Sequence, residues 1–145
     1  MKFQKFIFYF LSFTWGIVMT LVGLLVAGVL LLVGKKPKKH GWCWYFEVGE
    51  DWGGLNLGLI FLVGTDSLDV TKNHEFGHAF QNCVWGPLMP FVISIPSAIR
   101  YWYRELKYYR KGKYPPTNYT DIWFEWQATW IGRRAMYLIN NEKAQ

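Results

Sequence analysis

The sequence predicts a mainly α-helical fold that contains one short β-strand or hairpin element and begins with a transmembrane helix. Three observations predict this fold. Residues 6–34 are apolar and uncharged. Large apolar residues recur at every second position in residues 55–63, as in a β-strand. Residues 70–84 and 121–140 are expected to be helical. Aromatic residues make up 20% of the chain, which argues against a disordered or low-complexity protein. The cysteines, Cys43 and Cys83, are too few for a disulfide framework.

The N-terminal apolar segment is long enough to cross a membrane. As one helix, residues 6–34 would extend about 43 Å, more than the hydrocarbon core of about 30 Å. A cleaved signal peptide has a shorter apolar region that ends at a small-residue cleavage site, and this segment fits that pattern poorly. We therefore expect residues 1–34 to form a retained transmembrane helix, with its aromatic first part among the lipid headgroups.

The lysines that flank this segment predict its orientation. Lys35, Lys36, Lys38 and Lys39 follow it, whereas Lys2 and Lys5 precede it. Because basic residues are enriched on the cytoplasmic side, we expect an integral membrane protein whose residues 35–145 form a membrane-associated domain facing the cytoplasm.

The middle of the chain alternates between regular and irregular segments. Residues 55–63 are expected to form a strand, and residues 70–84 a helix that ends near Gly86 and Pro87. Residues 88–99 are apolar but too short to cross a membrane alone, which favours a buried, re-entrant or interfacial segment. A second membrane passage over about 87–103 stays open.

Basic and aromatic residues are interleaved in residues 100–113. Such a mixture can bind single-stranded nucleic acid, but beside an apolar segment it is more typical of a membrane interface. We expect membrane lipid as a partner and no nucleic acid.

A metal-binding pattern lies within the helix expected at residues 70–84. His74 and His78 are four residues apart, so both imidazoles project from one face and can bind one metal ion. Glu75 lies beside them, where it can act as a general base on a metal-activated water. Nitrogen and oxygen ligands suit zinc, and a catalytic zinc needs a third protein ligand.

The third ligand is chosen from the few remaining candidates. Glu125 lies among bulky apolar residues on a helix, where an unpaired carboxylate is costly, so it is preferred. Asp121 is the fallback, although it also suits a helix N-cap. The others are better explained as interfacial or solvated residues: His40, Glu105 and Glu142.

The motif and the segment 125–128 together resemble the gluzincin metallopeptidases, whose third zinc ligand is a glutamate in a Glu-x-x-Ala or Glu-x-x-Ser context. The resemblance is more specific to a group of small bacterial membrane proteins and covers about residues 50–135. In that group a glycine-rich strand precedes His-Glu-x-Gly-His. Gly-Pro-Leu, Ile-Pro-Ser and Glu-x-x-Ala-x-x-x-Gly follow, here at residues 86–88, 95–97 and 125–132.

This resemblance implies a minimal zincin-like helical core and a membrane-bound zinc metallopeptidase. One zinc ion would be held by His74, His78 and Glu125, and Glu75 would be the general base in the hydrolysis of a peptide or protein substrate. The strand at residues 55–63 would bind the substrate through backbone pairing, at Leu55, Leu57 and Leu59.

Two positions depart from the gluzincin pattern. Gluzincins often carry an aspartate four residues after the ligand glutamate, which orients a zinc-bound histidine. That position is Thr129 here, so we expect another group to orient the histidine. No histidine follows His78 to stabilise an oxyanion, and the candidate donors are Tyr119, Arg133, Arg134 and Tyr137.

Two other functions remain open. The metal could serve only to hold helices together in a catalytically silent membrane protein. Alternatively, the chain could be a small lipid- or partner-binding membrane protein without a metal, an interpretation that rests on residues 100–113.

Overall fold

The structure, a computed structural model, describes residues 1–50 and 52–144. This part of the chain is mainly helical, as predicted, and contains a four-stranded mixed sheet, which is larger than the short strand or hairpin element expected. The elements are α1 (Lys2–Phe13), α2 (Ile17–Leu32), β1 (Lys38–His40), β2 (Cys43–Glu47), β3 (Gly54–Leu57), β4 (Ile60–Val63), α3 (Asp69–Trp85), α4 (Ile95–Lys111) and α5 (Trp123–Lys143). Short 3₁₀ turns lie at Gly86–Leu88 and Tyr119–Asp121, and a π-helical turn lies at Pro90–Ser94.

The sheet has the strand order β1-β2-β4-β3. β1 pairs with β2 and β3 with β4 in antiparallel fashion, while β2 and β4 are parallel. The expected single strand at residues 55–63 is therefore wrong, because the chain reverses between β3 and β4. Gly58 adopts a φ of 74° at this reversal, and its N–H donates to the side chain of Asn56 at 2.9 Å.

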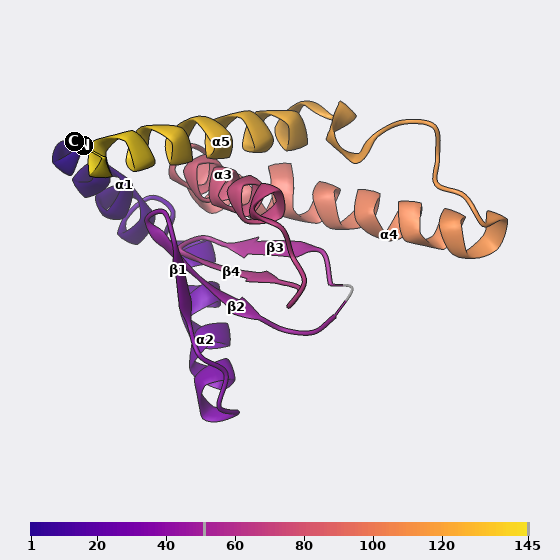
Figure 1. Cartoon of the computed structure of the whole chain (residues 1–145), viewed down its shortest axis with the longest axis horizontal. Coiled ribbons are helices and arrows are strands. Elements are labelled where there is room, and N and C mark those ends of the chain that lie inside the picture. Colours follow the sequence, from indigo (N-terminus) through magenta and orange to yellow (C-terminus); the bar gives the residue numbers. More distant parts are fainter. Residues whose placement is uncertain (51, 145) are drawn as a thin grey trace.

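Side chains along β4 point alternately to the two faces of the sheet, and both faces are packed. Phe61 and Val63 pack in a cluster with Phe76 of α3, whereas Ile60 and Leu62 pack in a cluster with Ala27 of α2. α3 and α5 thus lie on one side of the sheet and α2 extends along the other (Figure 1). The start of α1 and the end of α5 lie side by side, where the Met1 amino group contacts Glu142 at 3.0 Å.

The single helix expected over residues 6–34 is also wrong. The chain breaks between Phe13 and Ile17, and α1 and α2 are bent by 85° relative to each other. The break packs against the C-terminal end of α3. The Asn82 amide donates to the Gly16 carbonyl at 3.0 Å, and the Trp15 indole N–H donates to the Val84 carbonyl at 3.1 Å. A side chain at Gly16 would collide with Asn82, so glycine permits this close approach.

In the described part of the chain, no single helix has both the length and the apolar character needed to cross a membrane. Two pairs of consecutive helices are long and apolar enough when each pair is taken together, but both pairs are bent. The angle is 85° between α1 and α2, and 116° between the helical stretches 69–88 and 90–111.

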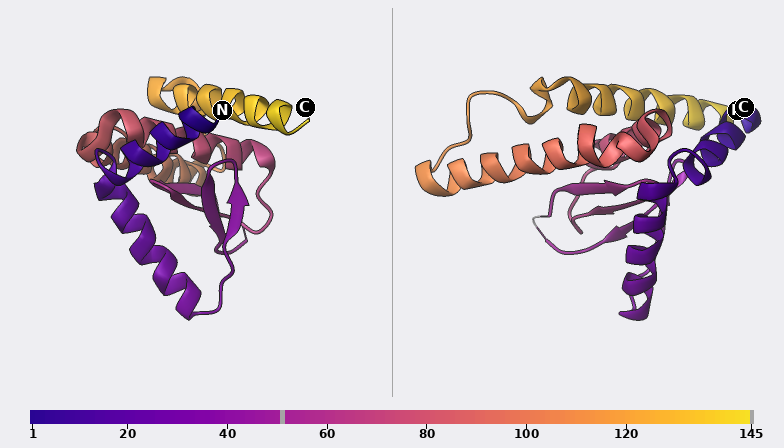
Figure 2. Two further views of the ribbon diagram at one scale, coloured as in Figure 1. Left: turned by 90° about the vertical axis from the view of Figure 1, so that its left-hand side faces the viewer. Right: turned by 180° about the vertical axis from the view of Figure 1, so that it is seen from behind.

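The segment expected to be buried, re-entrant or interfacial at residues 88–99 is helical. Met89 and Ile93 are buried, but Phe91, Ile95 and Ile99 are exposed, so a fully buried segment is excluded. α4 continues from it and runs outward, and residues 112–118 return the chain to α5 (Figure 2).

Candidate metal centre

The crossing of α3 and α5 brings the candidate ligands together. Gly77 on α3 faces the backbone of Ala128, and Gly132 on α5 faces the backbone of Asn73. A Cβ atom would lie 1.9 Å from the Ala128 oxygen at Gly77, and 1.7 Å from the Asn73 oxygen at Gly132. The two helices approach this closely only because these positions carry no side chain.

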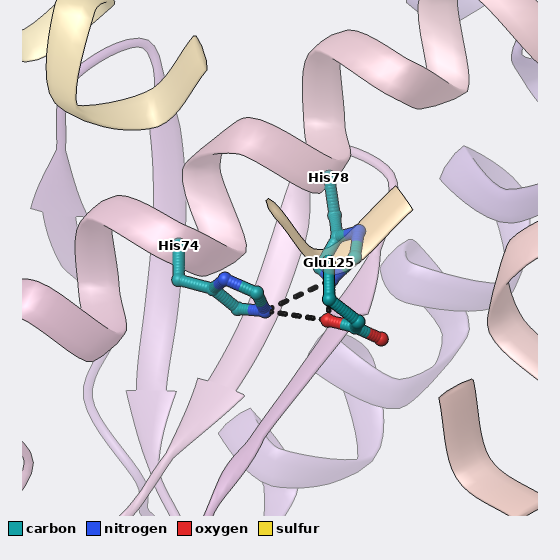
Figure 3. A group of neighbouring side chains, drawn as sticks. All are labelled: His74, His78 and Glu125. Carbon is teal, nitrogen blue, oxygen red and sulfur yellow. Dashed lines mark hydrogen bonds and ion pairs between the residues drawn. The ribbon is translucent and has the colours of Figure 1, made fainter. Parts of the chain in front are cut away.

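His74 and His78 project from α3 toward Glu125 at the start of α5 (Figure 3). The two histidine Nε2 atoms lie 3.1 Å apart. The Glu125 Oε2 atom lies 3.0 Å from Nε2 of His74 and 3.4 Å from Nε2 of His78. Ligand atoms bound tetrahedrally to zinc at about 2.0 Å are about 3.3 Å apart, so the three atoms match one face of such a site.

Thr129 fixes the tautomer of His74. Its hydroxyl donates to the backbone carbonyl of Glu125 at 3.0 Å, so its oxygen is left to accept from Nδ1 of His74 at 2.8 Å. Nδ1 therefore carries the proton and Nε2 presents a lone pair. The expectation that another group orients this histidine is wrong, because Thr129 performs this role itself.

Gln81 fixes the tautomer of His78 in the same way. Its amide nitrogen donates to the Phe124 carbonyl at 2.8 Å and to Gln127 at 2.9 Å, so its oxygen accepts from Nδ1 of His78 at 2.7 Å. Sequence reasoning did not single out Gln81. The available signal was its spacing, because Gln81 follows His78 by three residues on one helical face.

These hydrogen bonds direct two Nε2 lone pairs and a carboxylate at one point. Neutral imidazoles facing each other in this way repel unless a cation lies between them. Glu125 is fully buried, and apart from the histidine nitrogens neither of its carboxylate oxygens has a hydrogen-bond partner among the described residues. The donor set thus fits one divalent metal ion.

Glu75 lies beside this triad and points toward β3. A Cβ atom at Gly54 would lie 2.0 Å from Glu75 Oε1, so the absence of a side chain at Gly54 leaves room for the carboxylate. The Asn56 amide donates to the Glu75 carbonyl at 2.9 Å and ties the strand to α3. Burial raises the pKa of Glu75, although His78 and His74 partly offset this effect. Its Oε2 atom has no hydrogen-bond partner within residues 1–50 and 52–144.

Tyr119, one of the expected oxyanion donors, lies close to the triad. Its ring lies 6.3 Å from that of His74, and its hydroxyl forms a 2.6 Å hydrogen bond with Ser97 on α4. Burial, with the charge of Glu125 nearby, raises the pKa of Tyr119, so its hydroxyl stays protonated. Arg133 lines the adjoining cavity with Arg134, while Tyr137 lies beneath the Arg134 guanidinium at 5.6 Å.

The remaining candidate ligands lie elsewhere. His40 forms a 2.8 Å hydrogen bond with Asn73 and packs near Phe76. Asp121 accepts a hydrogen bond from the Asn118 backbone and caps a 3₁₀ turn. Glu105 pairs with Tyr114, and Glu142 with the amino terminus.

The strand expected to pair with substrate is partly in place. β3 is an edge strand and carries Leu55 and Leu57. Leu59 is not on that edge, because it lies buried in the turn, where its carbonyl accepts a hydrogen bond from the Trp44 N–H.

Two cavities meet at Glu75. The first, of about 890 Å³, lies between α3, α4 and α5, and the second, of about 380 Å³, lies between β3 and α4. Five residues line both: Gly53, Gly54, Glu75, Tyr101 and Tyr119. The metal-binding group is therefore accessible from a cleft large enough for a ligand.

Comparison of the chain with protein-family models, with curated proteins and with solved structures finds no match. The geometry of the site is therefore the basis for any functional conclusion.

Proposed function

We propose that this protein is a membrane-bound zinc hydrolase that cleaves peptide bonds, with Glu75 as the general base. One observation carries the proposal: His74, His78 and Glu125 converge on one point beside the buried carboxylate of Glu75, in the wall of a cleft. A site built only to hold helices together needs neither the cleft nor the unpartnered base.

The ligand set favours a catalytic zinc site. Three protein ligands of nitrogen and oxygen type leave one coordination position open, as catalytic zinc sites do. A zinc ion there would supply a Lewis acid, which lowers the pKa of water and polarises a carbonyl group. Thr129 and Gln81 hold the imidazoles in the binding tautomer, so little reorganisation accompanies loading.

The chain's own groups supply the proton transfers. Glu75 accepts a proton from the attacking water, a step that burial favours by raising the pKa of its carboxylate, and then gives this proton to the leaving amine nitrogen as the C–N bond breaks. The protonated Tyr119 hydroxyl can then donate a hydrogen bond to the oxygen that becomes negative in the transition state. Ser97 holds that hydroxyl from α4.

The resemblance to gluzincin metallopeptidases supports a peptide or protein substrate. It rests on the histidine pair, Glu75, and a ligand glutamate followed by Ala128 and Gly132. The structure gives these small residues a physical role, because Gly77, Ala128 and Gly132 let α3 and α5 cross within ligand distance.

Apolar surfaces support attachment to a membrane. Phe3, Phe6, Phe10 and Phe13 of α1, with Leu21, Leu25 and Leu32 of α2, are exposed. One face of α4 and the turn before it is also exposed and apolar, and it carries Phe91, Ile95, Ile99, Trp102, Leu106 and Tyr109. Lys107, Arg110 and Lys111 near the end of α4 suit anionic headgroups. Resistance of the protein to extraction from membranes by alkaline carbonate tests this attachment.

The cytoplasmic placement of residues 35–145 stays a proposal that rests on the lysines after α2. A reporter fused after Gln145 tests it, because a reporter active only in the cytoplasm should then be active.

The test of catalysis compares the zinc-loaded, detergent-purified protein with Glu75→Gln on a mixed-sequence peptide substrate. We expect the variant to keep its zinc and to lose about 10²–10⁴-fold in rate, the usual contribution of a general base. Glu142→Gln, a matched change at the chain end, is the control and should cleave like the wild type.

A second candidate function is a structural metal site, because the ligands join α3 to α5. It predicts that Glu75→Gln has no effect on any rate, while His74→Ala releases the metal and destabilises the fold.

A further inference from the structure

Resting on the hydrolase function above, we propose that the site selects substrates by two unlike cavities that flank the cleaved bond. A large apolar side chain occupies one cavity, and an acidic group occupies the other. The substrate class is therefore a peptide with an apolar residue on one side of the cleaved bond and an acidic residue, or a terminal carboxylate, on the other.

The smaller cavity, here called the apolar chamber, has a volume of about 380 Å³. Its apolar wall comes from β3, α4 and the turns beside them: Trp52, Leu55, Met89, Ile93, Ala98 and Trp102. Apart from Glu75 and His78 of the metal centre, no charged or titratable group other than tyrosine hydroxyls lines it within the described residues. An apolar side chain gains by burial here, whereas an acidic one loses hydration without meeting a lysine or arginine in the described lining.

The larger cavity, here called the cationic chamber, has a volume of about 890 Å³. Arg104, Arg133 and Arg134 line it, and outside the metal centre Glu105 is the acidic residue among its described lining.

Two of these guanidinium groups are available to a ligand. Arg104 is held by the Thr117 carbonyl, but Arg133 has no hydrogen bond or ion pair with the described residues. Arg134 lies over the ring of Tyr137, and its N–H groups make no hydrogen bond or ion pair with the described residues. Such groups bind a carboxylate in a bidentate manner.

The junction of the chambers coincides with the chemistry. Glu75 and Tyr119 line both chambers, and so does Gly54, whose missing side chain leaves room for the Glu75 carboxylate at the junction. A chain that reaches from one chamber into the other therefore passes over the proposed general base.

The test uses quenched-fluorescence peptides that vary one position on each side of a single cleavable bond. Leu or Asp occupies the apolar-chamber side, and Glu, Gln or Lys occupies the other, with each set made in both chain directions. In one of the two chain directions, we expect kcat/KM for the Leu/Glu peptide to exceed that for the Leu/Lys peptide by about tenfold. Equal cleavage of the Glu, Gln and Lys peptides would overturn the proposal.

Charge-reversal variants distinguish a loss of substrate recognition from a general loss of activity. Arg134→Glu and Arg133→Glu should shift the ratio of Glu to Lys cleavage toward the Lys peptide, even where absolute rates fall. Lys143→Glu makes the same change in net charge at the chain end and should leave the ratio unchanged. An equal shift in all three variants would show a general electrostatic effect and overturn the proposal.

Binding distinguishes failure of this inference from failure of the proposed function. Fluorescence anisotropy measures the affinity of the same peptides for zinc-loaded Glu75→Gln. Preferential binding of the Leu/Glu peptide without cleavage by the wild type would contradict the hydrolase function and uphold the recognition. Binding without preference would overturn the recognition whatever the rate of cleavage.

Discussion

The hydroxyl of Thr129 lies 2.8 Å from Nδ1 of His74 and donates to the backbone carbonyl of Glu125, so one side chain connects two of the three candidate ligands. Thr129 is on α5 and His74 on α3. The same contact therefore fixes the histidine tautomer and the relative position of the two helices. The orientation of His74 at the metal centre therefore depends on the packing of α5 against α3.

The first prediction concerns this hydroxyl. Thr129→Val keeps the shape but removes the acceptor for Nδ1 of His74, and loss of such a partner typically weakens metal binding by about 10–100-fold. Thr129→Ser keeps the hydroxyl and should bind zinc within a few-fold of the wild type. Competition with a chromophoric chelator measures both affinities. Equal affinities for Val and Ser would show that the hydroxyl does not orient the ligand.

The second prediction concerns the helix crossing. Gly77→Ala places a Cβ atom against the Ala128 backbone and should destabilise the protein by about 1–3 kcal/mol, because neither helix can move without displacing a ligand. Gly28→Ala, on α2, meets no described atom within 4 Å and should stabilise the protein by about 0.5–1 kcal/mol. Denaturant unfolding in detergent measures both. Similar effects of the two changes would contradict a tight crossing at Gly77.

The third prediction concerns Gly54 of β3, which lies against the Glu75 carboxylate. Gly54→Ala would put a methyl group where Glu75 Oε1 now lies, and the flexible carboxylate would move aside. We expect the fold and the zinc content to be retained while peptide hydrolysis falls about 10²-fold, since a misplaced catalytic group loses that much. Gly28→Ala is again the matched control. Full activity of Gly54→Ala would contradict the placement of the general base.

The fourth prediction concerns removal of the metal. Because the ligands come from α3 and α5, zinc binds the folded chain and not the unfolded one, so a chelator should lower the unfolding temperature. Added zinc should restore it. In His74→Ala the chelator should have little further effect, and an undiminished chelator effect in that variant would place the stabilising metal elsewhere.

Much of this fold and site could be predicted from local patterns. The spacing of His74 and His78 places both on one helical face, and the helix observed over Asp69–Trp85 matches the expected 70–84 within a residue at each end. Glu125 could be selected because an isolated carboxylate among aromatic residues is costly to bury.

The missed features depend on contacts between distant segments. The helix break at residues 14–16 depends on Asn82, which lies far along the chain. Its side-chain amide donates to the Gly16 carbonyl and packs closely against Gly16. β1 and β2 are short strands, and neither the pairing of β1 with β2 nor that of β2 with β4 is encoded in local alternation. The apolar stretch 17–32 also covers one face of the sheet, so its hydrophobicity serves the core as well as any lipid contact.

The zinc content of the purified protein, compared between the wild type and Glu125→Ala, tests the central claim most directly. We expect about one zinc ion per wild-type chain and much less in the variant, since three converging ligands define the site. Glu142→Ala, which removes a carboxylate remote from the centre, should retain the wild-type content. Equal zinc in wild type and Glu125→Ala, or none in metal-replete wild type, would contradict a metal centre formed by His74, His78 and Glu125.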